Sequence, residues 1–242
     1  MTKRINLISG PRNISTALMY AWANRLDTQV VDEPMYAYYL EKTGIDYHLG
    51  IPETMASMPS DLDQVKSQLI FQSIPAEIYF IKGMAHHYVD CDLDFLLELD
   101  NVFLIRDPKQ LITSFAKVVE HPTMQDIGLK REWEIYNYLL DRGQEPIVMD
   151  SNVVLSDPKM LLSKLCKQLG VPFDTAMLSW EQGPLPEDGT WAKYWYQNVW
   201  SSKGWGEPDL RPRVLPDHLS ELYEEAVEYY NRLRVHALES KH

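Results

Sequence analysis

Short, continuous apolar runs alternate with helical patterns along much of the chain. Such runs are typical of strands covered on both faces, because neither face then needs polar residues. Alternating strands and helices favour parallel pairing with right-handed crossovers. We therefore predict an α/β fold of three layers, α/β/α, around a central, mostly parallel five-stranded sheet. The predicted strands are residues 5–9, 28–33, 77–82, 101–106 and 146–150.

The segments between and after the strands predict one domain over residues 1–242. Helix starts are marked where Asp107 and Asp157 each precede a proline, since an acidic N-cap followed by proline favours a first helical turn. Residues 44–75 lack a strand pattern and hold three prolines, which predicts an insertion or lid. Residues 180–242 form an aromatic segment and then a long amphipathic helix, which is a candidate contact for a homodimer.

Charge and cysteine content narrow the class of partner. The formal net charge of −12 disfavours nucleic acid and an anionic membrane surface, because both need a basic face. Cys91 and Cys166 are not spaced as a metal-binding pair, so we expect neither a zinc site nor a disulfide framework. The first residues lack an apolar signal segment, and we expect a cytoplasmic protein that acts on a small molecule.

The loop after the first strand predicts an anion site. A tight turn that leads into a helix presents unpaired backbone amides, and here an arginine and two hydroxyls accompany them. The pattern is not that of a Walker loop, because no Gly-Lys pair follows. The candidate residues are Gly10, Pro11, Arg12, Asn13, Ile14, Ser15 and Thr16.

A second candidate anion site follows the fourth strand. Arg106 ends this strand, and Ser114 lies in the second turn of the next helix. A guanidinium can hold a phosphate through two hydrogen bonds, and a hydroxyl can add a third. Both candidate sites should lie at the carboxyl edge of the parallel sheet, where they could hold a ligand with two separate phosphate groups.

The two sites together resemble the sulfotransferases that use 3′-phosphoadenosine 5′-phosphosulfate (PAPS). Residues 11–16 resemble the family's loop for the 5′-phosphosulfate, and Arg106, Pro108 and Ser114 match its motif for the 3′-phosphate in type and spacing. A third stretch, residues 147–173, is similar in its strand, its Asp-Pro helix start and its Leu-Gly end. The family usually has glycine at the position of Ile14. Because isoleucine disfavours positive φ, we expect this loop to be shaped differently.

The resemblance implies a P-loop-like fold and a metal-free transfer from PAPS, with 3′-phosphoadenosine 5′-phosphate (PAP) as product. Arg12 would then stabilise the leaving phosphate, and Lys82 would contact the transferred group. Two bases are open: Glu33 after the second strand, or His86 or His87 after the third. We favour His86 of the two histidines, because only one of two neighbours can face the site. A weaker similarity assigns cofactor contacts to Ser202, Lys203 and Gly204.

Two other functions stay open at this point. A P-loop phosphotransferase would place Asp32, Glu33 or Asp150 near a magnesium ion, although the missing Gly-Lys pair disfavours it. A non-catalytic nucleotide-binding module would bind PAP without transferring any group. The sequence does not identify the acceptor, nor whether its oxygen or its nitrogen is sulfated.

Overall fold

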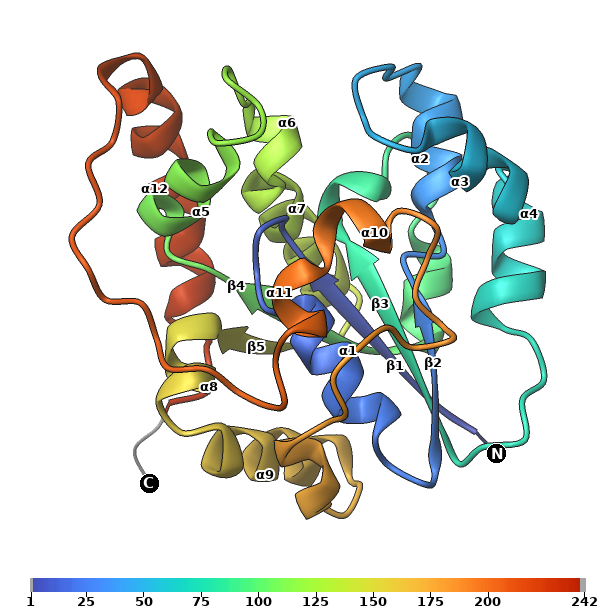
Figure 1. Cartoon of the computed structure of the whole chain (residues 1–242). Helices are drawn as coiled ribbons and strands as arrows, with labels where there is room; N and C mark the ends of the chain where they lie inside the picture. The colour runs from blue at the N-terminus through green and yellow to red at the C-terminus, as the bar shows by residue number, and fades with distance from the viewer. Residues whose placement is uncertain (1, 240–242) are drawn as a thin grey trace.

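The computed structural model describes residues 2–239. Its centre is a sheet of five strands in the order β2-β3-β1-β4-β5, and every pairing is parallel (Figure 1). The strands are β1 (Lys3–Ser9), β2 (Thr28–Asp32), β3 (Ile78–Met84), β4 (Asp100–Ile105) and β5 (Ile147–Asp150). All five predicted strands are therefore confirmed, with ends that shift by one or two residues.

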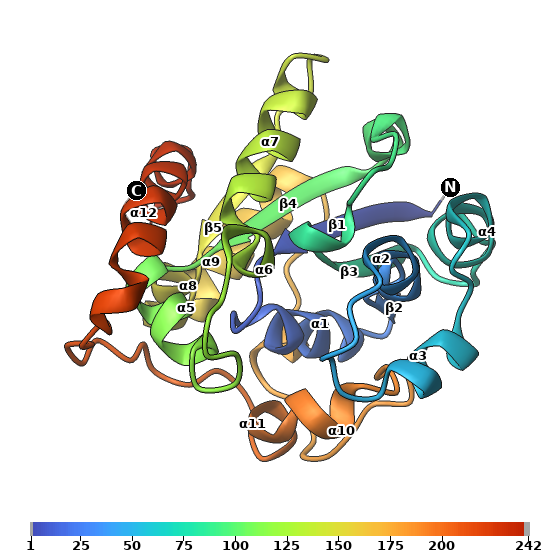
Figure 2. The same ribbon diagram turned by 90° about the horizontal axis from the view of Figure 1, so that it is seen from above.

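Helices cover both faces of the sheet, which confirms the three-layer prediction. Figure 2 shows α1 (Ser15–Ala23) and α7 (Leu129–Leu140) on opposite sides of the strands. The α1 side also holds α9 (Pro158–Leu169), and the α7 side holds α12 (Ser220–Arg234). Strand β1 shows why the apolar runs are continuous. Leu7 packs with α1 and α9 on one face of the sheet, Ile8 packs with α7 and α12 on the other face, and both are fully buried.

Shorter elements complete the chain between these layers. The two predicted helix starts are confirmed, because Asp107 accepts a hydrogen bond from the Gln110 amide at 3.0 Å and Asp157 from the Met160 amide at 3.0 Å. The short α-helices are α2 (Tyr36–Thr43), α3 (Ile51–Ser57), α4 (Leu62–Val65), α5 (Pro108–Phe115), α6 (Met124–Ile127), α8 (Ser151–Ser156), α10 (Ala192–Trp195) and α11 (Gln197–Trp200). A π-helical turn spans Lys66–Ile70, and 3₁₀ turns span Ala85–His87, Asp94–Glu98, Thr175–Leu178 and Asp217–Leu219.

The segment predicted as an insertion or lid holds α3, α4 and the π-helical turn. These elements lie with α2 beside the β2 edge of the sheet (Figures 1 and 2). Within residues 2–239, no helix has both the length and the apolar composition that a membrane crossing requires.

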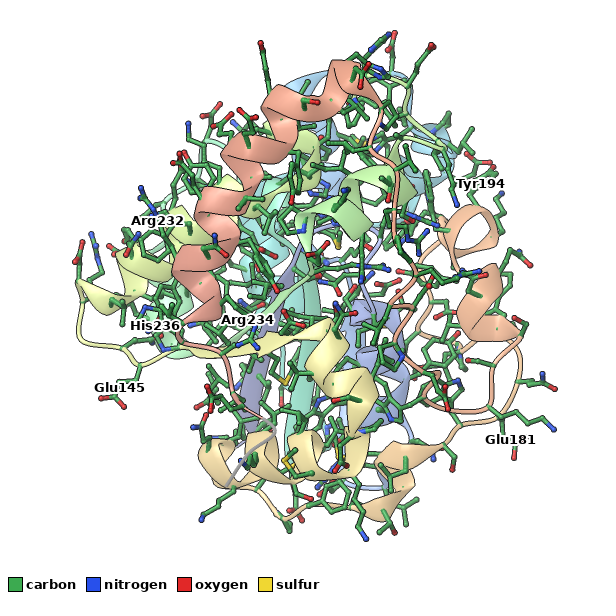
Figure 3. All side chains as sticks on the ribbon, turned by 90° about the vertical axis from the view of Figure 1, so that its left-hand side faces the viewer. Glu145, Glu181, Tyr194, Arg232, Arg234 and His236 are labelled. Carbon is green, nitrogen blue, oxygen red and sulfur yellow. The ribbon has the colours of Figure 1, made fainter. Side chains whose placement is uncertain are left out.

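Helix α12 packs along the outside of the molecule over the end of β5 (Figure 3). Tyr230 donates a hydrogen bond to Asp150 at 2.6 Å, and Arg234 forms an ion pair with the same carboxylate at 3.5 Å. Asp150 also caps α8 by accepting from the Asn152 amide at 2.8 Å. This strand-end carboxylate therefore has structural partners.

Candidate active site

The loop between β1 and α1 has the form of an anion-binding turn. Arg12 takes a positive φ of 54°, whereas Ile14 has a φ of −93° and needs no left-handed conformation. The residue that adopts the left-handed backbone in this loop is therefore Arg12, and Ile14, two residues later, keeps a negative φ that isoleucine tolerates. Asn13 fixes the loop to β4 by donating to the Leu104 carbonyl at 2.6 Å. Among residues 2–239, no side chain caps α1 by a hydrogen bond, so its first amides can meet an anion.

Gly10 allows this loop to pass close to the turn between α6 and α7. A Cβ at this position would lie 2.6 Å from the Ile127 carbonyl oxygen, which is backbone and cannot swing away. We expect Gly10→Ala to lower the free energy of unfolding by about 1–3 kcal/mol, because backbone must move to relieve the overlap. Chemical denaturation measures the change. Gly206→Ala serves as the control, since no atom of residues 2–239 lies within 4 Å of its added Cβ and its backbone is not in the left-handed region. Equal stabilities of the wild type and Gly10→Ala would contradict the prediction.

Guanidinium groups gather beside this loop. Arg12 donates from Nε to the Ser114 hydroxyl at 3.3 Å, and Arg106 donates to the Arg12 carbonyl. Burial, and then the charges of Arg213 and Arg12, lower the pKa of Arg106. Arg106 and Arg213 each keep a buried Nε without a hydrogen-bond partner among residues 2–239. The two anion sites predicted from sequence thus form one continuous basic site, and such a cluster of like charges is suited to an anion.

Arg213 is a basic residue that the sequence analysis missed. It lies in the irregular segment between α11 and α12, and its guanidinium pairs with Asp209. The side-chain amide of Gln110, on α5, donates from Nε2 to the Asp209 backbone carbonyl at 3.2 Å. This hydrogen bond connects the segment to the basic site. The Arg-Pro-Arg sequence at 211–213 is a signal that could have indicated it.

Ser202, Lys203 and Gly204 lie elsewhere and do not line the cavity described below. The Ser202 hydroxyl accepts from the Trp180 indole at 3.1 Å, and the Lys203 carbonyl accepts from the Trp180 amide at 3.2 Å. Gly204 forms an isolated antiparallel bridge with Ser179. Backbone pairing thus holds this stretch against residues 178–180, and the structure does not support the predicted cofactor contacts.

A buried ion network joins the ends of β2 and β3. Lys82 donates from Nζ to Asp32 at 3.0 Å and to the Tyr196 hydroxyl at 2.6 Å, and it also pairs with Glu33. Tyr196 in turn donates to Asp32 at 2.8 Å and accepts from the Trp191 indole at 3.2 Å. Lys82 therefore has carboxylate partners already, which differs from its predicted contact with the transferred group.

The same network sets the charge state of Glu33. Its side chain is 10% exposed, and its backbone holds a φ of 42°, a strained conformation for a residue other than glycine. Burial raises the pKa of Glu33, the Lys82 charge lowers it, and the Asp32 charge raises it again. Burial is the largest of these effects, so the pKa of Glu33 is raised despite the nearby ammonium. Glu33 is thus a stronger base than an ordinary carboxylate.

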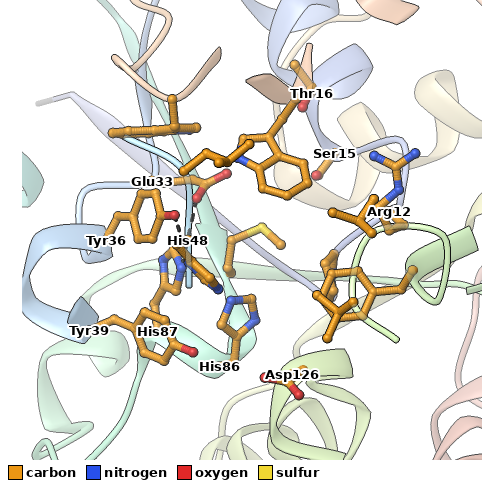
Figure 4. A pocket seen from close by; sticks show the side chains of 18 of the residues that line it. Arg12, Ser15, Thr16, Glu33, Tyr36, Tyr39, His48, His86, His87 and Asp126 are labelled. Atoms are coloured by element: carbon orange, nitrogen blue, oxygen red, sulfur yellow. Dashed lines mark hydrogen bonds and ion pairs between the residues drawn. The ribbon is translucent and has the colours of Figure 1, made fainter. Parts of the chain in front are cut away.

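A cavity of about 460 Å³ brings the loop and the ion network together (Figure 4). Pro11, Arg12, Ser15 and Thr16 line one part of it, and Glu33 and Lys82 line another. Gly10, Asn13 and Ile14 shape the loop without lining the cavity. The other lining side chains are mostly aromatic or apolar: Tyr36, Tyr39, Tyr47, His48, Leu49, Met84, His86, His87, Phe115, Val118, Val119, Asp126, Trp191, Trp195 and Tyr196. Apolar walls with a few polar groups are typical of a small-molecule site.

His86 and His87 lie in this wall as neutral rings. Burial lowers the pKa of His86 to about 3 and lowers the pKa of His87 well below the ordinary value. His87 stacks on Tyr36 at 4.8 Å between ring centroids, and its Nε2 lies 3.9 Å from a Glu33 oxygen. A histidine that resists protonation to this degree is a weak proton acceptor. Glu33 and His86 thus both line the cavity as candidate bases, and their pKa values shift in opposite directions, upward for Glu33 and downward for His86.

The fold is the one that sulfotransferase domains share. A family profile described as "Sulfotransferase domain" matches residues 3–237, and the chain belongs to that family. Two relatives from Arabidopsis thaliana, branched-chain-amino-acid aminotransferase-like proteins 1 and 2, are 36% and 35% identical over 233 and 234 residues. These alignments cover 96% of this chain but 42% and 41% of the relatives, so the chain spans about two fifths of their length.

Solved structures share the fold at low identity. The sulfotransferase domain of the Synechococcus PCC 7002 olefin synthase has a TM-score of 0.57 at 18% identity, with 95% of each chain covered. A sulfotransferase from Alicyclobacillus acidocaldarius has a TM-score of 0.55 at 12% identity, with 98% of each chain covered. The sulfotransferase domain of the curacin biosynthetic pathway has a TM-score of 0.52 at 17% identity, covering 97% of this chain and 98% of that domain.

Proposed function

We propose that this protein transfers a sulfuryl group from PAPS to a hydroxyl or amine of a small molecule. The observation that carries the proposal is the cluster of Arg12, Arg106 and Arg213 beside the uncapped start of α1, next to a cavity that holds Glu33. A donor with phosphate groups at two positions matches this charge distribution. The free thiols of Cys91 and Cys166 support a reducing compartment such as the cytoplasm.

Each part of the site has a role in the proposed reaction. PAPS would supply the sulfuryl group and a 5′-phosphate that leaves with the electrons of the broken S–O bond. Arg12 and the first amides of α1 would stabilise the charge on that phosphate, and Arg106 with Ser114 would hold the 3′-phosphate. Glu33 would take the proton of the acceptor as its oxygen or nitrogen bonds to sulfur. Lys82 would hold Glu33 in place.

Two observations disfavour a magnesium-dependent phosphotransferase. Asp32 and Glu33 are paired with the Lys82 ammonium, and Asp150 caps α8 and pairs with α12. These carboxylates therefore have partners other than a metal. The loop also has Ser15 and Thr16 where a Walker loop counted from Gly10 would have its Gly-Lys pair.

Calorimetric titration of PAP, Mg-ATP and AMP tests the proposal. We expect the wild type to bind PAP far more tightly than Mg-ATP or AMP, because Arg106 and its neighbours hold a 3′-phosphate. Arg106→Ala should weaken PAP binding by about 10- to 100-fold, the value of one or two charged hydrogen bonds.

Two variants control this experiment. Arg106→Lys keeps the charge and loses the guanidinium fork, so it should lose part of the affinity. Arg142→Ala removes an arginine that pairs with Asp94 outside the site and should bind PAP as the wild type does. No binding of PAP, or tighter binding of Mg-ATP, would overturn the proposed function.

A further inference from the structure

Asp126 places a carboxylate on the cavity wall without a cationic partner. Its Oδ2 accepts from the Thr123 amide at 2.7 Å and the Thr123 hydroxyl at 2.8 Å, and its Oδ1 accepts from the Tyr47 hydroxyl at 2.9 Å. All of these donors are neutral. Among residues 2–239, no Lys, Arg or His side chain forms an ion pair with it. The donors orient the carboxylate and leave its negative charge uncompensated.

Uncharged rings form the wall next to Asp126 (Figure 4). His87 stacks on Tyr36 and Tyr39 at 4.8 and 4.9 Å between centroids, and Tyr47 meets His48 edge-on at 5.1 Å. Burial lowers the pKa of His48, as it does for His86 and His87. The rings therefore carry no positive charge at neutral pH. Ring faces attract cations, most strongly where water is partly excluded.

The basic side chains of the site already have other partners or other proposed roles. Arg12 and Arg106 serve the donor phosphates in the proposed function, and Lys82 is held between Asp32 and Glu33. In Figure 4, Asp126 lies on the same side of the cavity as His86, across from Ser15 and Thr16. The space left for an acceptor thus meets neutral rings and a carboxylate, which together attract a positive group and repel a negative one.

We propose that the acceptor carries an ammonium group in addition to the group that is sulfated. The ammonium binds at Asp126 against the rings of Tyr39, Tyr47 and His86, while the reacting hydroxyl or amine points to Glu33. This inference rests on the proposed sulfotransferase function and adds the charge class of the acceptor. An acceptor with a carboxylate is rejected, because it would face Asp126 with no cation to compensate it.

Three phenols of similar shape and different charge test the inference. They are 4-(2-aminoethyl)phenol, 4-ethylphenol and 4-hydroxyphenylacetate. We measure the affinity of each for the PAP complex by calorimetry, and kcat/KM with PAPS for those that react. The wild type should prefer the amine over the neutral phenol by about tenfold, a combined effect of ion pairing and cation–π attraction. Asp126→Asn should remove the ion-pair part of that preference, leave only the smaller cation–π part, and keep the neutral phenol within about twofold of the wild-type value.

Controls separate a charge effect from a folding effect. Asp126→Glu keeps the charge and should keep a preference for the amine. Asp61→Asn changes a helix-capping aspartate outside the cavity and should leave the preference for the amine unchanged. If Asp126→Asn does not fold, Leu49→Lys is used instead, because it adds a cation at a half-exposed lining position. This variant should weaken binding of the amine and leave binding of the neutral phenol unchanged.

The outcomes distinguish this inference from the function on which it rests. Binding of PAP without any preference for the amine, by affinity or by kcat/KM, overturns the inference and leaves the sulfotransferase proposal standing. An equal loss for the amine and the neutral phenol in Asp126→Asn also overturns it, since charge would not be the cause. A wild type that does not bind PAP overturns both.

Discussion

Replacing Glu33 by glutamine is expected to lower kcat by about 100- to 10,000-fold, the usual contribution of a general base. Glutamine keeps the shape of the side chain and cannot take a proton. Glu33 pairs with Lys82 and Tyr196 rather than with Arg12 or Arg106, so PAP affinity should stay unchanged. The rate is measured with PAPS and the best phenol of the series, and the affinity by calorimetry.

The pH profile of kcat gives an independent test of the same role. The base must be ionised, and burial raises the pKa of Glu33, so the rate should fall with acid at a pH above the ordinary glutamate pKa of about 4.3. The acid limb should disappear from the residual activity of Glu33→Gln. Glu41→Gln, on the exposed face of α2, is the matched control. If Glu33→Gln keeps wild-type kcat and His86→Gln loses it, the base is His86.

Lys82→Met should lower the free energy of unfolding by about 3–5 kcal/mol, because it leaves Asp32 and Glu33 buried without their cation. Methionine fills a similar volume, so the change is mainly one of charge. Denaturant unfolding at neutral pH measures it. The wild type should lose the contribution of this ammonium only at high pH, because the network raises the pKa of Lys82 above that of a free lysine.

Two further variants test whether the buried carboxylates cause the loss of stability in Lys82→Met. Adding Asp32→Asn and Glu33→Gln to Lys82→Met should recover part of the lost stability, because both buried charges are then removed. Lys66→Met breaks an exposed pair with Asp63 and should cost less than about 1 kcal/mol. A Lys82→Met protein as stable as the wild type would show that the network does not bear on stability.

The strained backbone at Glu33 connects these two predictions. A positive φ at a residue other than glycine costs about 1–3 kcal/mol and persists only where surrounding contacts enforce it. The Glu33 amide donates to the Lys82 carbonyl at 2.7 Å, and the Lys82 ammonium holds the Glu33 side chain. The network thus holds the Glu33 carboxylate at the cavity, where the proposed function requires it.

The order of strands and helices, their parallel pairing and the basic loop could be predicted from the amino-acid sequence. These follow from local patterns: continuous apolar runs for covered strands, Asp-Pro pairs for helix starts, and a Gly-Pro-Arg turn between a strand and a helix. Arg106 and Ser114 were predictable because strand ends of a parallel sheet meet at one edge.

Which distant segments complete the candidate site became known from the folded chain. Arg213 and Tyr196 come from the irregular C-terminal region, whereas Ser202–Gly204 from the same region pair with residues 178–180. The sequences of these segments show no helical or strand periodicity that would predict which part of the chain they pack against. Asp126 has the local signature of a capping residue, and its place on an aromatic wall depends on residues 36–48 packing across from it. Side chains far apart in sequence are brought together by the packing of whole elements, which no local pattern encodes.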